Sequence, residues 1–130
     1  MQDTPTTEEA SFKQISDKVW QHLVERDWTN SKPRSLAISM ALEANELLEH
    51  YQWQDEPVGT KEELGAELAD VFIYGFQFAR HYGIDIPTAI TEKLRKSAEK
   101  YPVESFQGKS KEEQRRAWIE KKTTYTKNGL

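Results

Sequence analysis

Two segments decide the fold of this chain, residues 35–51 (SLAISMALEANELLEHY) and residues 61–82 (KEELGAELADVFIYGFQFARHY). Both repeat apolar residues every three or four positions, which is the spacing of one face of an α-helix. Each segment also carries two acids three residues apart: Glu43 and Glu46, then Glu67 and Asp70. Acids at this spacing project from the same side of a helix. Two such helices packed face to face would therefore bring four carboxylates together.

The rest of the chain is predicted to form further helices and connecting loops. Residues 12–26 and 85–101 show helical spacing, and Pro102 ends the second of them. Thr60 opens a capping box for the helix that follows it, and Gly83 is the expected end of that helix. Because no strand pattern appears, the fold class is predicted to be all-α and bundle-like.

The predicted organisation has three parts. Residues 1–10 are polar and are expected to be flexible, residues 11–102 form the domain, and residues 103–130 form a charged tail with a short helix around 112–121. The third helix is apolar nearly all round between Val71 and Ala79. A helix of this kind has too few neighbours in so small a chain, so we expect it to be buried against another copy.

Composition excludes several classes of function. A chain of 130 residues is one ordinary domain, and the absence of cysteine excludes disulfides and zinc-thiolate sites. The formal net charge of −4 argues against a nucleic-acid polymer as partner. No leader-like or membrane-spanning run appears, so no membrane partner is predicted and a cytoplasmic location is expected.

The two acid pairs are the strongest candidates for chemistry. A single pair occurs often by chance in acidic helices, whereas two pairs on neighbouring helices, each beside an apolar face, favour a metal site. All-carboxylate ligands suit hard cations, so Mg²⁺ is predicted, with Mn²⁺ as the alternative. A di-iron site would need histidines three residues after glutamates, and this chain has none at that spacing.

Other candidates have structural alternatives. Lys93 and Lys100 lie on one face of the predicted helix at residues 85–101. They either form a solvated basic face or neutralise bound phosphates. Trp28 and Trp53 stand in polar loops, where they either pack the loops or stack on a flat ligand. Tyr74 shares a stripe with the acids of the third helix and is structural unless those acids bind a ligand.

The order of these residues resembles that of the MazG-like all-α nucleoside triphosphate pyrophosphohydrolases. The resemblance rests on the two acid pairs, the 20 residues between them, and Lys93 with Lys100-Tyr101-Pro102. Within the family, four further runs resemble the branch that contains the dCTP pyrophosphatases: Glu25-Arg26-Asp27-Trp28, Pro33-Arg34-x-Leu36, Tyr51-Gln52-Trp53 and Asp70-Val71-Phe72-Ile73-Tyr74. The likeness covers about residues 12–102.

The resemblance implies a four-helix MazG-like bundle completed by oligomerisation, as a homodimer or homotetramer. It implies Mg²⁺-dependent hydrolysis of a (deoxy)nucleoside triphosphate, with dCTP or related dNTPs favoured, to the monophosphate and pyrophosphate. The catalytic and metal-binding residues would be the four acids. The substrate-binding residues would be Trp28, Trp53, Tyr74, Lys93, Ser97, Lys100 and Tyr101, with Arg34 as a weaker candidate.

Two positions depart from the family motif. Leu42 stands where the family has a glutamate, and Ser97 stands where it has an asparagine. Two alternatives to an enzyme therefore stay open. One is a nucleotide sensor that binds without hydrolysis, which the change at Ser97 would motivate. The other is a helical interaction module with solvated acids and no dependence on metal.

Overall fold

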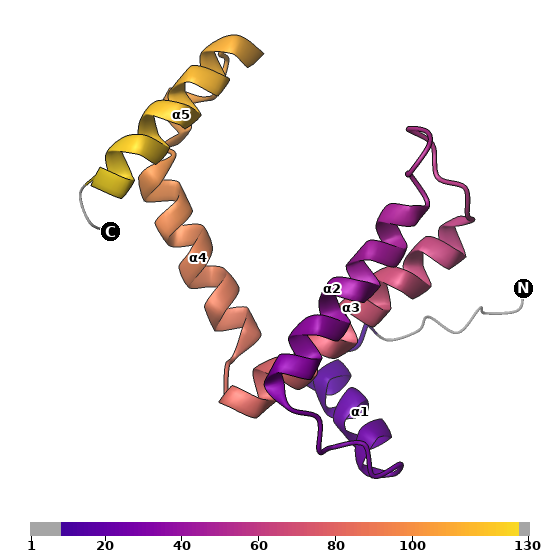
Figure 1. Ribbon diagram of the computed structural model, residues 1–130. Helices are drawn as coiled ribbons and strands as arrows, with labels where there is room; N and C mark the ends of the chain where they lie inside the picture. The colour runs from indigo at the N-terminus through magenta and orange to yellow at the C-terminus, as the bar shows by residue number, and fades with distance from the viewer. Residues whose placement is uncertain (1–8, 128–130) are drawn as a thin grey trace, which may run out of the picture. The chain divides into compact units, whose positions relative to one another are not determined.

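The computed structural model describes residues 9–127, and all regular structure in this range is helical (Figure 1). The predicted all-α class is confirmed. The described residues up to Asp85 form one compact unit, and those from Ile86 onward form a second. The helices are α1 (Phe12–Val24), α2 (Pro33–Glu49), α3 (Lys61–Tyr82), α4 (Ile86–Lys100) and α5 (Lys111–Lys127), with a short 3-10 helix, η1 (Val103–Ser105), before α5.

In the first unit, α2 and α3 lie side by side along most of their length, and α1 packs against α3 (Figure 1). Leu23, Leu36 and Ala79 are its buried apolar side chains. The ring of Phe12 meets the ring of Phe76 edge to face, with the centroids 5.2 Å apart. These contacts join all three helices, so the facing sides of α2 and α3 are held in a defined register.

The ends of α3 follow the sequence signals. The Thr60 hydroxyl accepts the Glu63 N–H at 3.2 Å, and the Glu63 carboxylate accepts the Thr60 N–H at 3.0 Å, which completes the predicted capping box. Gly83 ends the helix in the left-handed conformation, with φ at 65°. α1 ends at Val24, two residues earlier than expected, and the turn that follows places Asp27 at φ 57°.

The second unit contains more helix than the sequence indicated. The short helix expected around residues 112–121 is part of α5, which has 17 residues. The Gln114 side chain donates to the Phe106 carbonyl at 2.9 Å, and the rings of Tyr101 and Phe106 meet edge to face at 5.8 Å. The few apolar or aromatic residues of α5 are Ala117, Trp118, Ile119 and Tyr125, so apolar periodicity gave little signal for its length. Residues 1–8 of the expected flexible segment lie outside the described residues, and the domain bounds stay a prediction.

Several large apolar side chains are exposed in the single chain. Leu68 and Phe72, one turn apart on α3, are 47% and 53% exposed, and Leu42 of α2 is 60% exposed. By helical spacing, Leu68 and Phe72 lie on a different side of α3 from Glu67 and Asp70. Burial of α3 against a second copy stays a prediction. No helix within residues 9–127 is both long enough and apolar enough to cross a bilayer.

Candidate metal and nucleotide site

The packing of α2 on α3 makes neighbours of the two acid pairs. Partial burial, a side-chain hydrogen bond with Glu46, and the negative charges of Glu46, Asp70 and Glu67 together raise the pKa of Glu43 above its ordinary value. A carboxyl group responds in this way when other carboxylates lie close to it. Glu43 therefore lies near enough to the other three acids to be affected by their charge.

Glu67 is the most constrained member of this acid quartet. One of its oxygens, Oε1, lies 3.0 Å from Nε2 of His50, and its side chain is 24% exposed. The other oxygen, Oε2, is buried and has no hydrogen-bond partner. A buried carboxylate oxygen without a partner is costly, because it has lost water and gained nothing in exchange. A cation bound at this oxygen would remove that cost.

The side chains do not yet surround a common centre. Among the described residues, no group of three or more His, Asp or Glu side chains is arranged so that it could hold a metal ion. Glu67 faces His50 at 3.0 Å, and Glu43 has Glu46 as its nearest acidic influence. Even so, the four carboxylates fit a hard divalent cation. A cation would interact favourably with the unpartnered Oε2 of Glu67 and would reduce the repulsion between Glu43 and the other acids.

A hollow of about 340 Å³ adjoins the acids at Asp70. Trp28, from the loop before α2, and Tyr74, from α3, line it together with Asp70. The volume is within the range of small-molecule pockets, roughly 300–1,000 Å³. Aromatic rings and a carboxylate of the quartet thus border one space. Such a space suits a flat, partly polar ligand joined to a group that binds a cation.

Sequence analysis missed the other polar side chains of this hollow, which are His22, Ser31 and Gln77. The His22 ring lies 6.2 Å from the Trp28 ring, edge to face. Gln77 follows Tyr74 by three positions and Asp70 by seven, so the helical stripe of α3 contained the signal for it. No sequence pattern marked His22, since its place depends on how α1 packs.

Trp53 occupies a different place from Trp28. It stands in the loop after α2, is 86% exposed, and does not line the hollow. The two tryptophans stand in the loops before and after α2, whose 17 residues span about 25 Å. One base therefore cannot be clamped between Trp28 and Trp53 of the same chain.

The remaining predicted residues belong to other surfaces. Lys93 is exposed on α4, whereas Ser97, Lys100 and Tyr101 are half-buried. The Lys100 ammonium lies 5.4 Å from the centre of the Tyr101 ring, and the Ser97 carbonyl accepts the Tyr101 N–H at 2.7 Å. The second unit thus brings three of its four predicted residues together at the end of α4. Arg34 is exposed in the first turn of α2.

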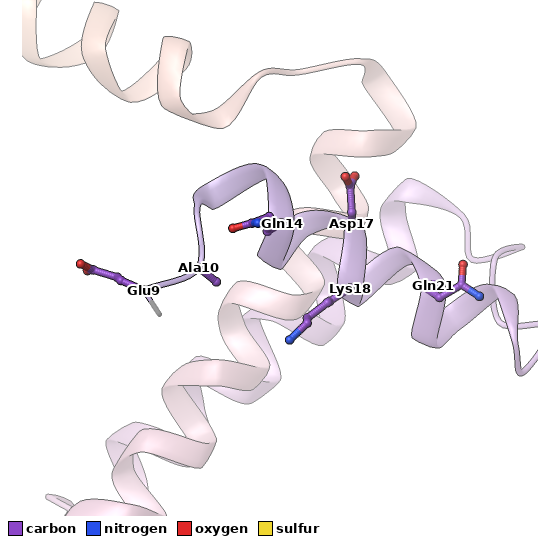
Figure 2. Close-up of a pocket in the computed structure, with 6 residues that line it drawn as sticks. All are labelled: Glu9, Ala10, Gln14, Asp17, Lys18 and Gln21. Atoms are coloured by element: carbon purple, nitrogen blue, oxygen red, sulfur yellow. The ribbon is translucent and has the colours of Figure 1, made fainter. Parts of the chain in front are cut away.

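Another hollow, of about 520 Å³, lies along α1 and contains none of the predicted residues (Figure 2). Its charged and amide groups point in different directions rather than toward a common point. No aromatic side chain lines it, so it offers nothing for a base to stack on. Its lining residues are Glu9, Ala10, Gln14, Asp17, Lys18 and Gln21.

Comparison with known proteins defines the class. The sequence model of the MazG-like family matches residues 38–115, a range that contains all four acids. The chain belongs to the MazG-like family, which confirms the resemblance found in the sequence.

Two relatives and one solved structure show which individual proteins the chain is similar to. The chain is 32% identical to dCTP pyrophosphatase 1 of Mus musculus over 93 residues, covering 65% of this chain and 55% of that protein. It is 33% identical to dCTP pyrophosphatase 1 of Homo sapiens over 87 residues, covering 60% and 51%. It thus spans about half the length of these relatives. A crystal structure of a pyrophosphatase from Archaeoglobus fulgidus covers 72% of this chain and 94% of its own, with a TM-score of 0.61 and 26% identity.

Proposed function

We propose that this protein is a metal-dependent nucleoside triphosphate pyrophosphohydrolase. Its substrates would be (deoxy)nucleoside triphosphates, with dCTP or a related dNTP preferred, and its products the monophosphate and pyrophosphate. One observation carries the proposal: Asp70 belongs to the acid quartet and also lines the hollow that holds Trp28 and Tyr74. The names of the two mammalian relatives support the preference for dCTP.

Glu43, Glu46, Glu67 and Asp70 would hold Mg²⁺ or Mn²⁺. When bound, the cation would supply charge for the phosphate oxygens and acidify water for attack on the α-phosphorus. Glu46 is the exposed member of the quartet and would accept the proton of the attacking water. The chemistry then needs no serine, cysteine or histidine nucleophile.

The hollow beside Asp70 would hold the base and the sugar. Stacking on Trp28 would contribute about 1–3 kcal/mol and would not choose among bases. Gln77 has both a donor and an acceptor with which it could bind the edge of a base. By family resemblance, Lys93, Ser97, Lys100 and Tyr101 would contact phosphate or sugar.

The active form would be a homodimer or homotetramer. Leu42, Leu68 and Phe72 leave apolar surface on α2 and α3 that a second copy would cover. Because Trp53 cannot reach the hollow of its own chain, a base held by both tryptophans would use Trp53 of another copy. Size-exclusion chromatography with light scattering measures the mass of the assembly and tests the proposed oligomer directly.

The enzymatic proposal is tested by incubating the protein with each dNTP and Mg²⁺ and identifying the products. Pyrophosphate and monophosphate are expected, most rapidly from dCTP or a modified relative of it. Asp70→Ala should remove activity, whereas Glu49→Ala, which alters an exposed acid at the end of α2, should not. Hydrolysis without a divalent cation would contradict the proposal, and metal-dependent binding without products would identify a sensor.

A further inference from the structure

We propose that His50 is a positioning residue for the cation site and that Gly59 fixes the place of its ring. His50 would hold one oxygen of Glu67 so that the other faces the cation. This inference rests on the proposed function, because it assigns a task to a neighbour of the acid quartet. No sequence pattern had suggested a role for His50.

A short chain of hydrogen bonds runs from the α2–α3 loop to the quartet. The Gly59 N–H donates to Nδ1 of His50 at 3.0 Å. Nδ1 must therefore offer its lone pair, which leaves the ring hydrogen on Nε2. Nε2 faces Oε1 of Glu67 at 3.0 Å and is oriented to donate to it. The loop thus sets both the tautomer and the direction of the ring.

The contact between His50 and Glu67 is partly shielded from water. The His50 side chain is 13% exposed, and the Glu67 side chain is 24% exposed. Only one Glu67 oxygen is engaged, since Oε2 is buried without a partner. This asymmetry is what a ligand carboxylate requires: one oxygen is held by the protein and the other remains for the cation.

Gly59 is required for steric reasons. A Cβ atom at this position would overlap Cε1 of His50 and would come within 2.6 Å of Nδ1 and 2.5 Å of Glu63 Oε2. Any side chain here would push the ring away from Glu67. Gly65 provides a matched control, because a Cβ atom there would meet nothing within 4 Å.

The position of His50 along α2 agrees with this role. It follows Glu46 by four residues and Glu43 by seven, so all three lie along one edge of the helix. The loop returns to the same place, since the Val58 N–H donates to the His50 carbonyl at 3.0 Å. His50 therefore joins α2, the loop and α3 at the acid quartet.

The test is direct binding of Mn²⁺ by calorimetry without nucleotide, together with the Mg²⁺ dependence of pyrophosphate release. His50→Leu should weaken Mn²⁺ binding by about 10–100-fold, which is typical for loss of a hydrogen-bond partner of a ligand. Gly59→Ala should act in the same way, and Gly65→Ala should match the original protein. His50→Gln keeps an N–H donor near the place of Nε2, so it should recover much of the lost affinity.

Thermal unfolding of each variant separates positioning from folding. Unchanged Mn²⁺ affinity in His50→Leu would overturn the proposal, whatever happens to its stability. If His50→Leu does not fold, Gly59→Ala and His50→Gln decide, and equal affinity in Gly59→Ala and Gly65→Ala would overturn it. If the original protein binds Mn²⁺ but hydrolyses no nucleotide, the proposed function fails, while the positioning role is still decided by Mn²⁺ affinity.

Discussion

The two acid pairs come from sequence patterns that look alike, but the structure treats them differently. On α2, partial burial and the neighbouring Glu46 raise the pKa of Glu43 above its ordinary value. On α3, Glu67 faces His50 at 3.0 Å, and Asp70 lines the hollow beside Trp28. The α3 pair thus faces groups outside the quartet, whereas Glu43 of the α2 pair is subject to repulsion that a cation would relieve. Acid pairs with the same spacing on two helices thus differ in their surroundings.

The largest expected effect comes from removing one acid from either helix. Glu46→Ala and Glu67→Ala should each lower kcat/KM by more than about 100-fold, because both pairs would share one cation and loss of a ligand exceeds the effect of losing its hydrogen-bond partner. Pyrophosphate release at saturating Mg²⁺ measures the effect, with Glu49→Ala as the control. If only Glu67→Ala loses activity, the α2 pair takes no part in catalysis.

A smaller effect is expected where the α3 pair meets the hollow. Trp28→Ala should raise KM by about 10–100-fold, since stacking contributes about 1–3 kcal/mol per base. Mn²⁺ affinity measured without nucleotide should stay the same, because Trp28 lines the hollow and is not a member of the quartet. Steady-state kinetics with dCTP measures KM. Weakened Mn²⁺ binding in Trp28→Ala would show that Trp28 also affects cation binding, contrary to the separation of base binding from cation binding.

The smallest expected effect concerns stability and pH. Because the pKa of Glu43 is raised in the folded chain above its ordinary value of 4.5, the native state binds more protons than the unfolded state in the interval above that value. The contribution of Glu43 to stability should therefore fall as pH rises through this interval. Glu43→Gln should raise the Tm at neutral pH with EDTA present and reduce the stabilisation by Mg²⁺.

Scanning calorimetry at several pH values checks this prediction. The difference in Tm between Glu43→Gln and the original protein should shrink as pH falls toward 4.5. The exposed acid Glu49 again provides the control, because Glu49→Gln should not change the response to Mg²⁺. A lower Tm for Glu43→Gln at neutral pH would mean that Glu43 stabilises the fold, which contradicts the claim that it is repelled by the other acids.

Local signals in the sequence predicted the parts of the molecule that depend on helix geometry. The capping box at Thr60, the end of α3 at Gly83 and the grouping of acids along α2 and α3 all follow from spacing within one helix. The role of His50 does not, because it requires a loop residue, Gly59, to return to α2 and Glu67 to arrive from α3. His50 shared an edge with Glu43 and Glu46, so the signal was present without its partners. α5 was underestimated because its polar sequence has little apolar periodicity.

The central claim is that acids from both helices hold one cation, and anomalous diffraction from crystals grown with Mn²⁺ tests it most directly. The account predicts a peak between α2 and α3, coordinated by Glu67 Oε2 and by at least one acid of the α2 pair. The absence of a peak there, at a Mn²⁺ concentration that saturates activity, would contradict it.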